Sequence, residues 1–131
     1  MGSFGDYLEN KVLDHVTGNS SYSAPTVYVA ASTADPTDDG SGAAEPSGNS
    51  YARVATSAAT WGDAASGSIT TVTDIEFPEA TGSWGTITHI ALYDASTNGN
   101  MLAHGALAAS QAVSSGEVLR ITAGNLTLTL S

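Results

Sequence analysis

Hydrophobic and polar positions alternate along residues 83–108 in two runs that flank a turn cluster at residues 95–100. Apolar side chains occur on both faces of the first run, residues 87–94, which is typical of a central strand covered on both sides. The turn contains Asn98-Gly99, and both residue types tolerate positive φ. The pattern therefore predicts a β-hairpin in the middle of a two-layer β-structure.

Further short β-patterned runs occur on either side of this hairpin, at residues 26–32, 51–55, 69–77, 118–121 and 126–130. In the run 69–77, Val72, Ile75 and Phe77 are the expected apolar anchors. Gly, Pro, Ser and Asn separate the runs, and no internal repeat is visible. The sequence thus predicts an all-β fold, an antiparallel sandwich or jelly-roll-like structure with about seven short strands and one N-terminal α-helix.

The helix is predicted over residues 3–16. Ser3 is the expected N-cap, with Asp6 three residues later in a spacing similar to a capping box. Its apolar stripe consists of Phe4, Leu8, Val12 and Val16, widened by Tyr7 and Leu13. Two interpretations follow: the helix closes one end of the sandwich, or it is an arm that docks on another subunit. We expect one domain, residues 1–131, with a helical arm at 1–18 and a β-sandwich at 26–131.

Residues 33–50 form the longest irregular stretch, rich in Pro, Gly, Asp and Ser. A loop of this length in a compact domain is usually functional or mobile. Asp35, Asp38 and Asp39 give it the oxygen density of a calcium loop and are weak candidates for metal ligands. The EF-hand register is absent, because the twelfth residue from Asp35 is Pro46 rather than Glu. A solvated acidic loop with Asx-turns is the default expectation.

The charge balance excludes several partners. The chain has thirteen acidic and three basic residues, which gives a net charge of −10. Binding of nucleic acid or of an anionic membrane surface needs Lys and Arg, so we expect neither. There is no cysteine, and neither a membrane-spanning run nor a signal peptide is apparent. We therefore expect a chain made in the cytoplasm of its host that stays soluble until it meets a partner.

The residues do not suggest catalysis. His15 lies in the predicted helix, His89 and His104 lie in predicted strands, and none is near a GxSxG-type motif. His89 and His104 flank the same hairpin and could meet across it at a metal, although hydrogen-bonded histidines on a sheet face are the favoured interpretation. We expect no enzyme activity and no cofactor.

Three segments resemble a family of small virion proteins of tailed bacteriophages. They are FGDYLENKVLDHVTG (residues 4–18), VYVAASTADPTDDGSGAAEPSGNSYARVA (27–55) and FPEATGSWGTITHIALYDASTNGNMLAHGAL (77–107). Members of this family are labelled tail fibre proteins or capsid decoration (cement) proteins. The shared motifs are specific to the family and carry no catalytic residue.

The resemblance implies a structural role in the virion. The first expectation is a capsid decoration protein on the outer head surface, a homotrimer that bridges subunits of the major capsid protein. The alternative is a tail-associated fibre protein, or a module of the virion that binds host glycans. Attachment through many modest contacts would become tight by multivalency. The expected contact residues are those of the helix and the acidic loop, namely Phe4, Tyr7, Leu8, Val12, Asp35, Asp38, Asp39 and Glu45.

Overall fold

The computed structural model describes residues 2–130. In this range the chain forms one α-helix, one 3-10 helix and nine strands. In chain order these are β1 (Ser3–Phe4), α1 (Asp6–Val16), β2 (Tyr28–Ser32), β3 (Val54–Ala55), the 3-10 helix η1 (Ala58–Thr60), β4 (Ser68–Thr70), β5 (Ile75–Glu76), β6 (Gly85–Tyr93), β7 (Met101–Val113), β8 (Arg120–Ile121) and β9 (Thr127–Thr129). All strand pairs are antiparallel, and the predicted all-β fold with a single α-helix is confirmed.

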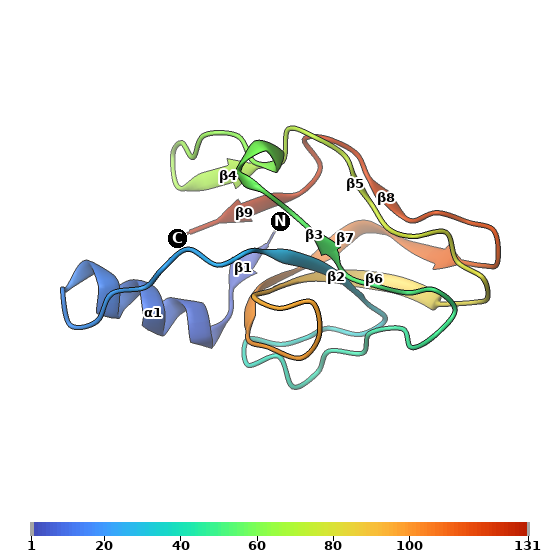
Figure 1. Cartoon of the computed structure of the whole chain (residues 1–131), viewed down its shortest axis with the longest axis horizontal. Coiled ribbons are helices and arrows are strands. Elements are labelled where there is room, and N and C mark those ends of the chain that lie inside the picture. The colour runs from blue at the N-terminus through green and yellow to red at the C-terminus, as the bar shows by residue number, and fades with distance from the viewer. Residues whose placement is uncertain (1, 131) are drawn as a thin grey trace.

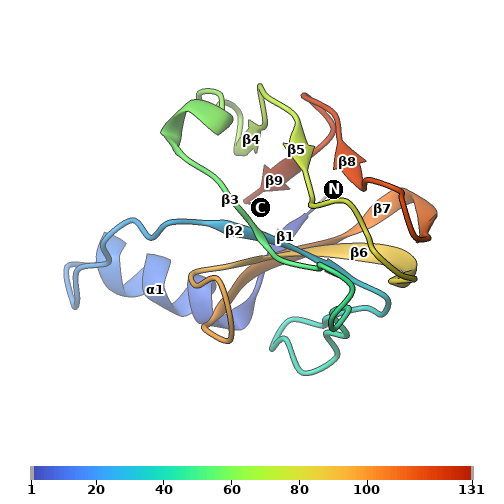
Figure 2. The same cartoon turned by 45° about the vertical axis from the view of Figure 1, so that its right-hand side comes forward.

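The strands make a five-stranded sheet in the order β1-β7-β6-β2-β3 and two small pairs, β4-β9 and β5-β8. The two small pairs lie over one face of the large sheet, and the irregular segment after β2 runs below its other face (Figure 1). The view turned by 45° shows the same layers, with α1 extending away from the sheets at one end of the molecule (Figure 2). The arrangement is sandwich-like.

The main core fills the space between the large sheet and the small pairs. Ile87, Ile90 and Leu92 from β6 are almost completely buried there, against Ile75 and other residues of the covering layer. The opposite face of the large sheet buries a smaller cluster, Ala30, Ala91, Tyr93 and Met101. Both faces of β6 are thus covered, as its doubly apolar pattern predicts.

The hairpin of β6 and β7 is the centre of the fold, as predicted. The strands pair from Gly85 with Val113 to Tyr93 with Met101, with irregularities between Ile87 and His89 and between Leu92 and Tyr93. At the tip, Asn98 and Gly99 have φ of 53° and 75°, so both adopt the left-handed conformation that the sequence suggested.

The start of the helix was predicted wrongly. Ser3 is no N-cap: it lies in β1, opposite His104 of β7, and α1 begins at Asp6 with Gly5 as the N-cap. No side chain caps the helix, and the capping box is absent. The cause is tertiary, because the backbone N–H of Gly5 donates to the carbonyl of Leu102 and that of Asp6 to the carbonyl of Asp38.

Several predicted strands are shorter than expected; residues 118–121, for example, form a strand only at Arg120–Ile121. The run 69–77 is divided into β4 and β5, and Val72 between them is 57% exposed, so it is no core anchor, whereas Ile75 and Phe77 are buried. The run 51–55 forms a strand only at Val54–Ala55. Beyond this short strand, the backbone N–H of Ala31 in β2 donates to the side-chain hydroxyl of Tyr51 instead of to a backbone carbonyl.

Candidate functional site

The contact residues predicted on the N-terminal segment are only half-buried. Phe4 lies in β1, Tyr7 and Leu8 pack against the main core, and Val12 lies on α1. These side chains therefore help to fix α1 on the body. The apolar residues that α1 leaves to solvent are Leu13 and Val16, with exposed fractions of 63% and 75%. That this segment contacts a partner stays a prediction.

The predicted acidic loop is held in place by its own side chains. Asp39 accepts the N–H of Ser41 and the hydroxyl of Thr37, and these bonds lower the pKa of Asp39 from 3.8 to about 2. Asp35 accepts the N–H of Thr37. The carboxylate of Asp38 lies 2.9 Å from His104 Nε2, which joins the loop to β7.

The weak metal candidates do not assemble into a metal site. Asp35 is 3.8 Å from His104 Nδ1, but Asp39 is engaged within the loop. Within residues 2–130 no group of three or more His, Asp or Glu side chains could hold a metal ion. His89 and His104 do not face each other across the hairpin, since they lie opposite Ala106 and Ala91.

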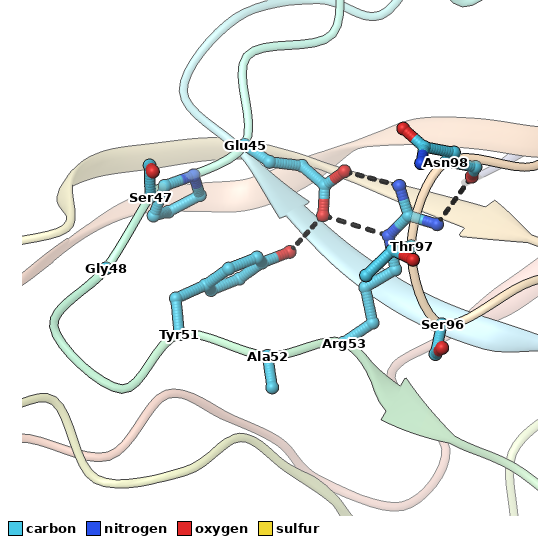
Figure 3. Close-up of a pocket in the computed structure, with 10 residues that line it drawn as sticks. Glu45, Ser47, Gly48, Tyr51, Ala52, Arg53, Ser96, Thr97 and Asn98 are labelled. Atoms are coloured by element: carbon cyan, nitrogen blue, oxygen red, sulfur yellow. Dashed lines mark hydrogen bonds and ion pairs between the residues drawn. The ribbon is translucent and has the colours of Figure 1, made fainter.

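Glu45, the last predicted contact residue, is part of an ion-pair cluster at the end of the loop. Its carboxylate accepts two bonds from Arg53, from Nη2 at 2.6 Å and from Nε at 3.0 Å, and one from the Tyr51 hydroxyl at 2.6 Å (Figure 3). Arg53 Nη1 donates to the carbonyls of Ala95 and Asn98, both at 2.8 Å. The cluster thus ties the loop to the tip of the β6–β7 hairpin.

Burial and hydrogen bonding act in opposite directions on the pKa of Glu45. The side chains of Arg53 and Glu45 are 6% and 23% exposed. Burial alone would raise the pKa of Glu45, but the hydrogen bonds from Arg53 and Tyr51 outweigh it, so the pKa of Glu45 is lowered. Burial and the bond to Glu45 raise the pKa of Tyr51. The guanidinium also stacks on Tyr93, with Cζ 3.8 Å from the ring centre.

Tyr51 and Arg53 were not among the predicted site residues. The available signal was that Arg53 is one of only three basic residues and follows an acidic loop. A cleft of about 500 Å³ lies beside the cluster, between residues 45–53 and the hairpin tip. Ser47, Ser96, Thr97 and Asn98 line its rim and are exposed (Figure 3). Because the charged groups at its base bond to one another, the cleft has the chemistry of a structural junction.

A second hollow, here called the apolar groove, lies between α1 and the β4-β9 pair and has a volume of about 230 Å³. Its lining contains no charged residue and consists of Leu8, Tyr22, Pro25, Val27, Trp61, Ile69, Leu92, Leu102 and Leu128. A neighbouring hollow of about 190 Å³ shares Ile69 and Leu128 with it and reaches Leu130, which is 53% exposed. The side chains that line the apolar groove are half-buried or buried, several of them packed against the main core, so it is an apolar hollow in the surface of that core.

The sequence also matches a known protein family. The model of a family described as "Podophage GP4 fiber I protein gp80" matches residues 3–129, nearly the whole chain. No curated protein matches the sequence. Among the described residues, no helix is long and apolar enough to cross a membrane.

Proposed function

The chain belongs to the family described as podophage GP4 fiber I protein gp80, and from this membership we propose that it is a non-enzymatic structural subunit of a bacteriophage tail fibre. The match over residues 3–129 is the observation that carries the proposal. The chain is a phage virion structural protein, and the description of its family names a fibre. This family description fits the tail-fibre alternative better than the capsid decoration role that we expected first.

The described side chains support a structural role. Glu45 and Arg53 are largely buried and bond to each other, and Arg53 also bonds to the backbone of the hairpin tip. Such a closed network stabilises a loop and leaves no group poised for proton transfer. We further propose that the subunit assembles with copies of itself, as a homotrimer, through the apolar surface beside α1.

The location of the protein on the virion tests the fibre proposal. Purified particles would be separated into heads and tails, and the protein would be quantified in each fraction by mass spectrometry, with the major capsid protein as the marker of heads. Labelling of intact particles with antibody and gold would give its position directly. We expect it in the tail fraction, in few copies per particle. Abundant copies in heads that are free of tails would overturn the proposal in favour of capsid decoration.

A further inference from the structure

We propose that Asn98, at the tip of the β6–β7 hairpin, is a site of spontaneous deamidation, and that the ion pair of Glu45 and Arg53 is part of a latch that slows this reaction. The latch is the set of hydrogen bonds that joins Glu45 and Arg53 to the backbone carbonyls of Ala95 and Asn98. Deamidation converts the side-chain amide of asparagine into a carboxylate without an enzyme. The modification concerns the folded chain itself, so it is independent of where the protein lies on the virion.

The hairpin tip presents the two groups that react. Asn98-Gly99 is the only Asn-Gly pair of the chain. Because glycine has no side chain, its backbone nitrogen approaches the preceding asparagine side chain with the least hindrance. Both residues are exposed, and within residues 2–130 neither the Asn98 side-chain amide nor the Gly99 N–H makes a hydrogen bond. The amide and its nucleophile are therefore both free and open to water.

The reaction needs only these two groups and water. The backbone nitrogen of Gly99 attacks Cγ of Asn98, the new N–Cγ bond closes an imide ring, and the Cγ–Nδ2 bond breaks. The amide nitrogen leaves as ammonia, with the proton that the Gly99 nitrogen gives up. Water then opens the ring: addition at Cγ gives aspartate, and addition at the former backbone carbonyl gives isoaspartate, which lengthens the backbone of the tip by one methylene. Either product adds a negative charge next to the latch.

The fold restrains ring closure through the Asn98 carbonyl. Asn98 has φ of 53°, and in the left-handed conformation Cβ and the next nitrogen lie nearly opposite each other about the Cα–C bond. For the Gly99 nitrogen to reach Cγ, this bond must rotate, and the Asn98 carbonyl turns with it. Arg53 Nη1 donates to that carbonyl and to the carbonyl of Ala95, both at 2.8 Å, while Nε and Nη2 bond to the Glu45 carboxylate (Figure 3). The attacking geometry is therefore reached only when the tip leaves Arg53.

Two other asparagines serve as internal references. Asn19 and Asn49 are exposed and each precedes a serine, whose side chain hinders the approach of its nitrogen. Their side-chain amides are also engaged, since Nδ2 of Asn19 donates to Asp14 and Nδ2 of Asn49 donates to the carbonyl of Ser83. We therefore expect both to react more slowly than Asn98.

Peptide mapping by mass spectrometry tests the site and the restraint. Wild type would be incubated in mildly alkaline buffer, which promotes loss of the amide proton, both folded and unfolded in urea. In each state the conversion of amide to acid should be faster at Asn98 than at Asn19 and Asn49. The folded chain should react at Asn98 at least about tenfold more slowly than the unfolded one. Equal rates at the three asparagines would overturn the site, and equal rates in the two states would overturn the latch.

The variant Glu45→Gln tests whether the ion pair holds the latch closed. It removes the charge that positions Arg53, so the folded variant should react at Asn98 at least about fivefold faster than folded wild type. Should circular dichroism show that Glu45→Gln is unfolded, Arg53→Lys replaces it. That variant keeps a cation beside Glu45 but lacks the planar fork that reaches both carbonyls, and it should also react faster. A folded latch variant that reacts at the rate of wild type would contradict the role of the ion pair.

Two controls separate release of the tip from a general loss of charge or stability. Glu76→Gln breaks the exposed pair with Arg120, and it should leave the rate at Asn98 unchanged. Ile121→Ala weakens the main core in β8, in the layer opposite the large sheet, and keeps the latch, so its rate should stay close to that of wild type. In urea all variants should react like wild type. Acceleration by Ile121→Ala as large as that by Glu45→Gln, or differences that persist in urea, would show that the latch does not control the reaction.

Discussion

Glu45 and Arg53 form the ion pair on which the attachment of the acidic loop depends. Replacement of Glu45 by Gln leaves the Arg53 charge buried with only carbonyl partners, so we expect the free energy of unfolding to fall by about 3 kcal/mol. Glu76→Gln is the matched control. It breaks the ion pair with Arg120, in which both side chains are about half exposed, and should cost much less, because exposed ion pairs are screened by solvent. Urea denaturation would measure both, and equal losses would contradict the assigned importance of the buried pair.

The same residue predicts a dependence of stability on pH. The pKa of Glu45 is lower in the folded protein than in the unfolded chain, so the unfolded state binds more protons in acid. The contribution of Glu45 is therefore complete above the ordinary Glu pKa and is lost as the pH falls through the folded value. We expect the stability difference between wild type and Glu45→Gln to shrink between about pH 7 and about pH 3. A difference that stays constant in urea titrations over this range would contradict the prediction.

At the scale of elements, the tip of the β6–β7 hairpin requires a glycine. Gly99 has φ of 75°, and a Cβ there would lie 2.6 Å from Asp94 Oδ1 and 2.7 Å from Ala95 Cβ. Gly116 has φ of 86°, but a Cβ there would meet nothing within 4 Å. Gly116→Ala should thus cost about 1 kcal/mol from backbone strain alone, and Gly99→Ala about 2–3 kcal/mol. Equal losses of stability in urea denaturation would show that contact at the tip adds nothing.

The elements that the sequence predicts well are those whose signals are local. The alternation in residues 87–94 and the Asn98-Gly99 dipeptide contain the information for the central hairpin within about a dozen residues. By the same local rules Ser3 resembles a helix N-cap. It lies in a strand instead, because its segment pairs with the edge of β7. Val72 has the β-branched side chain of a strand residue, but it lies in the break between β4 and β5. In both cases, strand pairing between segments that are distant in sequence determines the local structure.

The candidate site was less accessible to sequence analysis. The acidic loop stands out by composition, and Glu45 was identified with it. Arg53 lies only eight residues from Glu45, so this pair was within reach of sequence analysis. The attachment of the pair to the hairpin tip was not, because the carbonyls that Arg53 binds lie more than forty residues further along the chain. Similarly, the amphipathic stripe of the helix was evident. Which of its apolar residues remain exposed depends on the docking of α1 on the body, which fixes Leu8 inward and Leu13 outward.

For the whole molecule, net charge and apolar surface act in opposite directions. Each copy has a net charge of −10, so copies repel one another over a distance that salt controls, whereas burial of the apolar surface beside α1, through which we propose self-assembly, is insensitive to screening. Added salt should therefore strengthen self-association, and the dissociation constant should fall at least about threefold from about 0.02 M to about 0.3 M NaCl.

Sedimentation equilibrium across this salt range would measure the effect. The variant Val118→Asp, which leaves the apolar groove unchanged and adds one negative charge, should show the same trend as wild type. Association that weakens as salt is added would mean that ion pairs, rather than apolar burial, hold the copies together. The apolar groove would then lose its place as the centre of the interface.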